Sequence, residues 1–111
     1  MSTCRFHHPG LAQGRWRDLP FISQLANVGS EVERTIKWRH EERLSQQAFE
    51  RALELLDLTI ADPKNRGRLR ELTRVREALV DYFMFDNDYG SSDALWRSYF
   101  YAFSYAARLG L

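Results

Sequence analysis

Acidic side chains recur at helical spacing in this sequence, and carboxylates paired in this way can bind a divalent cation. Glu54 and Asp57 are three residues apart, and Glu31 lies on an earlier predicted helix. Offsets of three or four residues place side chains on one face of a helix. Carboxylate oxygens are ligands that Mg²⁺ accepts, and the bound metal can in turn hold substrate phosphates. Glu31, Glu54 and Asp57 are therefore candidate metal ligands.

The ExxD spacing of Glu54 and Asp57 resembles one half of the metal site in the all-α nucleoside triphosphate pyrophosphohydrolases related to MazG. Those enzymes hold Mg²⁺ with an ExxE pair on one helix and an ExxD pair on the next. The resemblance implies a Mg²⁺-dependent nucleotide hydrolase as an alternative function. The other half departs from the family pattern, because the position three residues after Glu31 is Arg34. Loss of one carboxylate leaves too little negative charge for a hard cation.

Ion pairs between neighbouring helices explain the same carboxylates without a metal. In a helical hairpin that turns near residues 63–65, Asp57 lies level with Arg70, and Glu54 lies level with Arg74. Each exposed pair of this kind stabilises a protein by about 0–1 kcal/mol. We therefore expect no catalytic residues and no cofactor, and the hydrolase remains an alternative.

The predicted helix over residues 66–85 has an unusual charge order. Five arginines lie in its first half: Arg66, Arg68, Arg70, Arg74 and Arg76. The helix dipole favours the opposite order, by about 0.3–1 kcal/mol per charge. A helix start rich in guanidinium groups can bind phosphate or an RNA backbone, with Arg66, Arg68 and Arg70 as the candidate ligands. Glu71 offsets part of this charge, and no aromatic residues are interleaved to stack unpaired bases. An RNA- or anion-binding module is a second alternative.

Aromatic residues are concentrated near the end of the chain, where ten of the fifteen fall between Tyr82 and Tyr105. On a helical wheel, the apolar arc of residues 92–108 is close to twice the ~100° that a helix in a monomeric bundle needs. This excess predicts that the helix packs against a second copy or another protein, since Trp and Tyr are favoured interface anchors. The expected interface residues are Trp96, Tyr99, Phe100 and Phe103.

The excess apolar surface has two alternative interpretations. In the first, the N-terminal segment, which contains Phe6 and Trp16, folds over it. In the second, the aromatic side chains line a pocket for a large cofactor.

Four predicted helices position these residues. Apolar side chains recur every three to four residues over about 20–42, 46–62, 66–85 and 92–108. Ser45 is a candidate N-cap for the second helix, and Ser91 or Ser92 for the fourth. The loops are short, so the most economical all-α architecture is an antiparallel up-and-down four-helix bundle. Residues 1–19 show no period and are predicted to be an irregular lead-in, and residues 20–111 to form one domain.

Small residues predict which helices approach most closely. The first helix carries Gly29 between Ala26 and Ser30, and the fourth carries Ala102 and Ala106. An interior helical glycine costs about 1 kcal/mol relative to alanine. Close packing of the first helix on the fourth is the expected compensation.

Composition limits the class of protein. The chain has 111 residues, 44% of them hydrophobic and 28% charged, which is typical of one soluble globular domain. The net charge of +1 excludes a strong overall field toward nucleic acid. A single cysteine, Cys4, allows no intrachain disulfide and favours a cytoplasmic location. His7 and His8 with Cys4 lack a fourth ligand for zinc. No apolar run is long enough for a membrane span, and no secretory signal is recognisable.

Four segments resemble a family of short, uncharacterised, all-helical prokaryotic proteins. They cover most of the chain and comprise residues 29–38, 48–64, 68–83 and 96–109. The resemblance implies an all-helical fold and no particular activity. Together with the aromatic helix, it leads to the prediction of a non-catalytic interaction or scaffolding protein that forms a homo-oligomer or binds another protein.

Overall fold

The computed structural model describes residues 14–110, and these residues form helices and loops without any strand. The all-helical prediction is therefore confirmed for this part of the chain. Cys4, Phe6, His7 and His8 lie outside the described residues. The elements are η3 (Trp16–Asp18), α1 (Phe21–Lys37), α2 (Glu42–Ala61), η4 (Pro63–Arg68), α3 (Leu69–Met84) and α4 (Asp93–Arg108).

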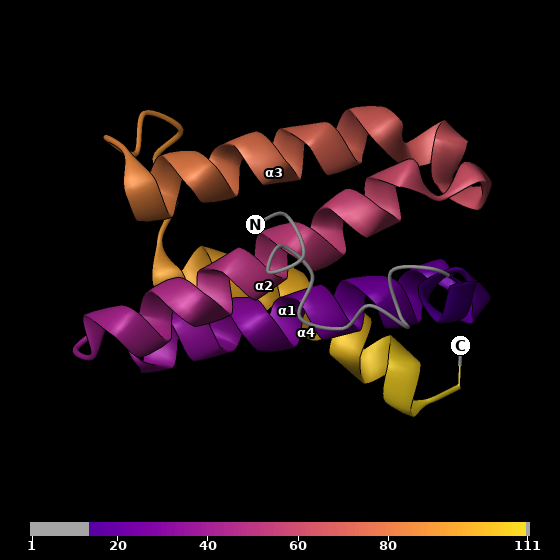
Figure 1. The fold of residues 1–111 in the computed structure, drawn as a ribbon, viewed down its shortest axis with the longest axis horizontal. Coiled ribbons are helices and arrows are strands. Elements are labelled where there is room, and N and C mark those ends of the chain that lie inside the picture. Colours follow the sequence, from indigo (N-terminus) through magenta and orange to yellow (C-terminus); the bar gives the residue numbers. More distant parts are fainter. Residues whose placement is uncertain (1–13, 111) are drawn as a thin grey trace.

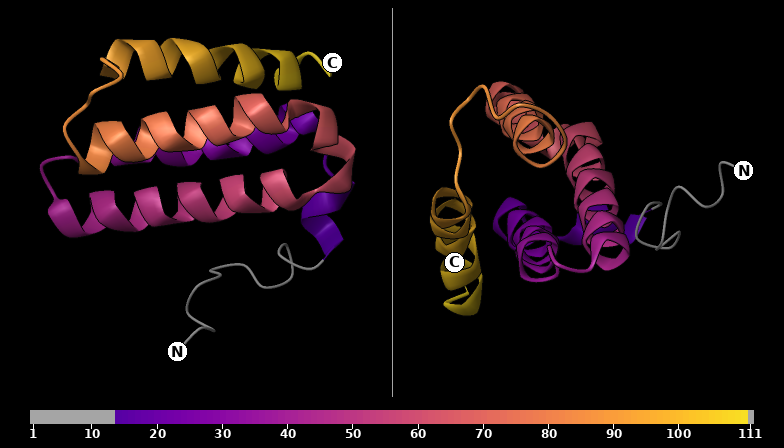
Figure 2. Two further views of the ribbon diagram at one scale, coloured as in Figure 1. Left: turned by 90° about the horizontal axis from the view of Figure 1, so that it is seen from above. Right: turned by 90° about the vertical axis from the view of Figure 1, so that its left-hand side faces the viewer.

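Helix α1 is the centre of the packing, since it contacts both α2 and α4 along much of its length, whereas α3 rests mainly on α2 (Figure 1). The α1–α2 and α3–α4 connections lie at one end of the molecule, which we call the loop end (Figure 2). Segment η4 and the C-terminal turn of α4 lie at the other end, which we call the η4 end. This packing fits a helical bundle.

The core is built from the apolar stripes of the four helices. Leu25, Leu56, Leu72 and Leu79 are completely buried. Full burial of a side chain of this size contributes about 1.5–3 kcal/mol relative to exposure. The spacing of Leu72, Val75 and Leu79 explains why α3 presents only a narrow stripe to α2 and leaves most of its circumference in solvent.

The turn between α2 and α3 is longer than predicted, and this shifts the register of the two helices. Pro63 opens the 3₁₀ segment η4, and the buried carboxylate of Asp62 accepts a hydrogen bond from the backbone N–H of Lys64 at 3.1 Å. Helix α3 consequently begins at Leu69 rather than near residue 66. The predicted pairing of Asp57 with Arg70 is wrong, because the Asp57 carboxylate accepts hydrogen bonds from Arg76 at 2.7 and 3.3 Å.

The predicted N-caps differ in outcome. Helix α2 begins at Glu42, so Ser45 is not its cap, and its hydroxyl donates to the carbonyl oxygen of Thr35 at 2.8 Å. The Ser92 cap is confirmed, since its hydroxyl oxygen accepts a hydrogen bond from the N–H of Leu95 at 3.1 Å.

The predicted close approach of α1 and α4 is confirmed at Gly29. A Cβ atom placed on Gly29 would lie 2.6 Å from the Cβ of Phe100, well inside van der Waals contact. The contact is with Phe100 rather than with one of the alanines of α4. Glycine at this position therefore gives the Phe100 ring room to pack directly on the α1 backbone.

A buried polar network joins four segments at the η4 end. The Trp16 indole donates to the Thr59 hydroxyl at 3.1 Å, and the Gln24 amide donates to the Asp62 carboxylate at 2.9 Å. Asn65 completes the network by donating to the Gln24 side-chain oxygen at 2.9 Å. Trp16, which was predicted to lie in the irregular lead-in, is thus buried against the end of α2 and is not packed as a cover over α4.

Candidate functional site

Helix α4 has an inner face that belongs to the core of the subunit. Trp96 and Phe100 are each only 4% exposed, and Tyr99 and Phe103 are partly buried against the same core. Trp96 and Phe100 are therefore not accessible to a partner protein, whereas the sequence predicted both as interface residues. The physical reason is the Gly29 contact, which draws this side of α4 onto α1 and covers its largest rings.

The opposite side of α4 carries the apolar surface that the subunit leaves uncovered. We call it the α4 outer face, and its residues are Ala94, Leu95, Ser98, Tyr101, Ala102, Tyr105 and Leu109. All seven are exposed and none is charged, and Arg108, which borders the face, lies over the Tyr101 ring at 6.0 Å. Leu95, Tyr101, Tyr105 and Leu109 expose 49%, 58%, 50% and 56% of their surface, respectively. The rings of Tyr101 and Tyr105 stack with their centroids 6.0 Å apart.

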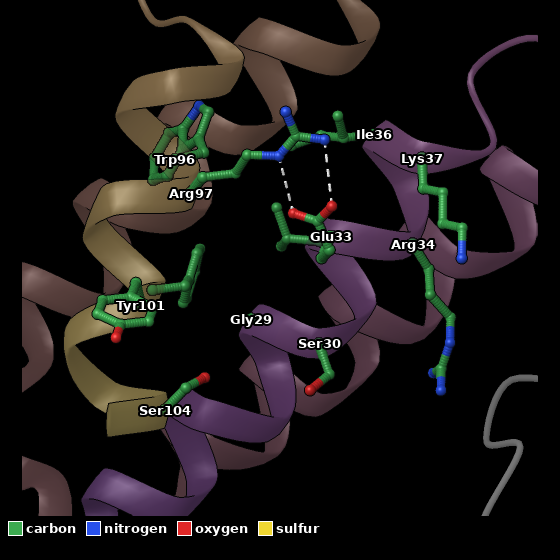
Figure 3. Close-up of a pocket in the computed structure, with 12 residues that line it drawn as sticks. Gly29, Ser30, Glu33, Arg34, Ile36, Lys37, Trp96, Arg97, Tyr101 and Ser104 are labelled. Atoms are coloured by element: carbon green, nitrogen blue, oxygen red, sulfur yellow. Dashed lines mark hydrogen bonds and ion pairs between the residues drawn. The ribbon is translucent and has the colours of Figure 1, made fainter. Parts of the chain in front are cut away.

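A groove of about 580 Å³ separates α1 from α4 beside this face (Figure 3). Its floor is apolar and includes Gly29, Trp96 and Phe100. Near the loop end, Arg97 reaches across from α4 and donates two hydrogen bonds to the Glu33 carboxylate at 2.9 and 3.1 Å. Hydrogen bonding to Glu33 raises the pKa of Arg97 above its usual value. This exposed ion pair covers part of the groove. Each of its two charges is already paired with the other.

Trp96 lies between two grooves, and its indole nitrogen is the only buried side-chain polar atom among residues 14–110 without a hydrogen-bond partner. The second groove, also of about 580 Å³, runs between α3 and α4. A buried N–H without a partner costs about 1–3 kcal/mol. Burial of the large ring offsets that cost. We conclude that Trp96 holds α4 in place chiefly through its apolar area.

The candidate metal ligands do not converge on one point. Glu31 accepts hydrogen bonds from Arg34 at 2.7 Å and Arg51 at 3.4 Å, and Asp57 is paired with Arg76. Glu54 is 8% exposed on the buried side of α2. Within residues 14–110, no group of three or more His, Cys, Asp or Glu side chains could hold a metal ion. The geometry that the hydrolase alternative requires is thus not found in this part of the chain.

The candidate anion ligands lie in one short segment, η4 and the first turn of α3. Arg66, Arg68 and Arg70 are all exposed at the η4 end. The Arg68 guanidinium lies 4.3 Å from the centroid of the Phe21 ring, a cation–π contact that fixes its position. Arg68, Arg70 and Arg74 also line the groove between α3 and α4.

A charged clamp at the loop end was not predicted from the sequence. Arg39 donates two hydrogen bonds of 2.9 Å to Asp93, and the Tyr82 hydroxyl donates to the same carboxylate at 2.6 Å. The hydrogen bond from Arg39 lowers the pKa of Asp93, and burial raises the pKa of Tyr82. This clamp ties the end of α1 to α3 and to the first turn of α4. The sequence signal was Asp93 directly after the Ser92 cap, where an acid also favours the helix dipole.

A further contact between α3 and α4 involves Tyr99, whose hydroxyl donates to the Glu71 carboxylate at 2.9 Å. Burial, with a smaller contribution from Glu71, raises the pKa of Tyr99 far above its usual value. The phenol therefore remains a neutral hydrogen-bond donor at physiological pH, and Glu71 is engaged within the subunit.

No protein-family model matches the chain, and no curated protein or solved structure is significantly similar to it. Among the described residues, no helix is both long and apolar enough to cross a membrane. Functional inference for this protein therefore depends on its own surface geometry.

Proposed function

We propose that this protein is a non-catalytic interaction module that forms a homodimer through the α4 outer face. The observation that carries the proposal is the absence of any charged side chain among the seven residues of that face. Four of them are large apolar or aromatic residues that are about half exposed. A contiguous apolar surface of this kind is typical of a protein–protein contact.

The spacing of the outer-face residues suits a second copy of the same helix. Residues 95, 98, 102, 105 and 109 are separated by alternate steps of three and four, the spacing of a helix–helix seam. In an antiparallel pair, Leu95 of one copy lies opposite Leu109 of the other. Ser98 and Ala102 are small enough to let the two backbones approach near the centre.

Charge and symmetry favour the same arrangement. In an antiparallel pair the start of each α4, at Asp93, lies beside the end of the other, at Arg108. The two helix dipoles also oppose each other in that arrangement. A contact that uses the same face of both copies closes as a two-fold dimer and does not propagate further.

The size of the face implies modest affinity. Its exposed side chains amount to roughly 500–600 Å² per copy if a whole aromatic side chain is taken as about 200 Å². A standard interface buries about 800 Å² per partner. We therefore expect a dissociation constant on the order of 10–100 µM.

We further propose that the bundle has the antiparallel up-and-down order predicted from its loops. Three contacts support this order: Gln24 with Asp62, Arg76 with Asp57, and Arg97 with Glu33. Gln24 near the start of α1 meets Asp62 just after the end of α2, and Arg97 near the start of α4 meets Glu33 near the end of α1, as expected for antiparallel neighbours. A cytoplasmic location remains the proposal that follows from the lone Cys4.

The proposal is tested by measuring molar mass with light scattering at about 200 µM protein. The wild-type chain should exceed its monomer mass of 13.1 kDa substantially. Tyr101→Glu/Tyr105→Glu should return the mass to that of the monomer, because two buried charges without partners are costly at an apolar contact. The matched control is Phe85→Glu/Tyr89→Glu, which adds the same charge at two exposed aromatics outside the face. A larger mass that survives in the α4 variant but not in the control would place the interface elsewhere.

A further inference from the structure

The arginines of this protein fall into two groups according to their partners. Away from the η4 end, five arginines form salt bridges with carboxylates: Arg34, Arg39, Arg51, Arg76 and Arg97. These pairs consume Glu31, Glu33, Asp57 and Asp93. Most of the positive charge on the body of the bundle is therefore balanced within the chain.

The η4 end has the opposite character. Its exposed cationic side chains are Arg15, Arg17, Lys64, Arg66, Arg68, Arg70, Arg74 and Arg108. The carboxylates in the same segments are Asp18, Asp62 and Glu71, and Glu77 lies one helical turn beyond Arg74. Lys64 pairs with Asp62, and Glu71 accepts the Tyr99 hydroxyl, so both acids are already engaged. Since the whole chain carries only +1, the remainder of the molecule is net negative and the charge is strongly polarised.

Contacts between elements bring these cations onto one surface. Lys64 donates to the carbonyl oxygen of Arg17 at 2.9 Å, which joins η3 to η4. Arg68 lies over Phe21 at the start of α1, and the Phe21 ring contacts Phe103 near the end of α4. The C-terminal turn of α4, which carries Arg108, lies at the same end of the bundle (Figure 2).

None of the seven guanidinium groups of this set forms a salt bridge with a carboxylate within residues 14–110. Arg68 and Arg108 lie over the rings of Phe21 and Tyr101, and the other five are Arg15, Arg17, Arg66, Arg70 and Arg74. Like charges gathered on one surface destabilise the folded chain unless an anion lies among them. Guanidinium donors form bidentate hydrogen bonds with phosphate oxygens, which suits them to a phosphate ligand. The positive end of the α3 dipole lies on the same surface and adds to the attraction.

We propose that the η4 end binds the phosphate backbone of a nucleic-acid duplex without reading its sequence. A duplex presents closely spaced phosphates to a surface with several guanidinium groups. Stacking of unpaired bases is disfavoured, since Phe21 is covered by Arg68, Trp16 is buried, and the Tyr101 ring already has Arg108 over it at 6.0 Å. Insertion into a lipid interface is disfavoured as well, because the large hydrophobic residues exposed toward this end of the described chain, Leu69, Tyr105 and Leu109, are outnumbered by the exposed charged residues. None of these cationic side chains is among the seven residues of the α4 outer face, and the two surfaces adjoin at the last turn of α4, where Arg108 lies over the Tyr101 ring.

The test measures binding of the full chain to a fluorescent duplex of mixed sequence, as RNA and as DNA, between 50 and 200 mM salt. The separated strands and vesicles of anionic lipid are measured in parallel. If about five phosphates are neutralised, the logarithm of the binding constant falls with the logarithm of salt concentration at a slope of about −4.5. Arg66→Gln/Arg70→Gln/Arg74→Gln should reduce that slope to about −2 and weaken binding at least tenfold at 50 mM salt. Comparison of the RNA and DNA arms shows whether the backbone type matters.

The matched control is Arg34→Gln/Lys37→Gln/Arg43→Gln, which removes three positive charges from exposed residues away from the η4 end. It should change the affinity less than threefold. An equal loss in the control, no binding by the wild-type chain at 50 mM salt, or binding only to vesicles of anionic lipid would each overturn the proposal. Much tighter binding to single strands would overturn the assignment to a duplex. The molar mass of both triple variants separates this result from any failure of the α4 contact.

Discussion

The two faces of α4 carry the same kinds of residue but have opposite environments. On the inner face, Trp96 and Phe100 are 4% exposed, whereas Tyr101 and Tyr105 on the outer face are 58% and 50% exposed. The difference arises from the neighbouring helix. Helix α1 packs closely on the inner face at Gly29 and leaves the outer face uncovered. Aromatic character therefore does not identify an interface by itself. The packing of the subunit determines which rings are left for a partner.

The largest expected difference between the two faces of α4 is in how much each contributes to the free energy of unfolding. Trp96→Ala should lower the free energy of unfolding by about 3–5 kcal/mol, because it removes a buried ring and leaves a cavity. Tyr105→Ala should change it by about 0.5 kcal/mol or less when measured well below the dimerisation range. Urea denaturation monitored by circular dichroism at about 1 µM protein measures both. Similar losses for the two variants would mean that the faces are not energetically distinct.

The second prediction concerns the contact that creates the difference. Gly29→Ala should destabilise the protein by about 1–2 kcal/mol, since overpacking against Phe100 outweighs the gain in helix propensity. Gly67→Ala is the control, because a Cβ atom there meets no other atom within 4 Å. Thermal unfolding of both variants gives the comparison. A Gly29→Ala variant as stable as the wild type would show that α4 is free to move away from α1.

A smaller effect is expected at the start of α4, where Asp93 is clamped by Arg39 and Tyr82. The folded pKa of Asp93 is lowered from 3.8, so its stabilising effect is present above that value and is lost as the pH falls through the folded pKa. Asp93→Asn should cost about 1 kcal/mol at pH 7, discounted for the exposure of Arg39. The difference from the wild type should shrink as the pH falls below 3.8. A pH-independent difference in melting temperature would rule out this ionic contribution.

The sequence was sufficient to predict four helices and their approximate positions, because their apolar residues repeat at helical spacing. It also predicted the α1–α4 approach at Gly29 and the Ser92 cap. It did not predict η4, where Pro63 and the Asp62 side chain favour a 3₁₀ turn in place of the first turn of α3. These six residues form a tighter helix and therefore shift the register of α3 relative to α2. As a result, the partner of Asp57 is Arg76 rather than the predicted Arg70.

The candidate sites were predicted less completely, because side-chain pairing depends on the relative rotation of helices. The wheel indicated a wide apolar arc on α4, part of which is exposed in the subunit, yet it could not show which part α1 covers. Tyr101 and Tyr105, at the margin of the predicted arc, are the exposed rings. The arginines of η4 and α3 were recognised as a group, but their lack of carboxylate partners became visible only with the fold.

Sedimentation equilibrium of the wild-type chain over 10–300 µM tests the central claim, that the α4 outer face is an interface between two copies, most directly. The average mass should rise with concentration from 13.1 kDa toward twice that value, and it should level off there because a two-fold contact closes. A mass of 13.1 kDa across the whole range would contradict the claim.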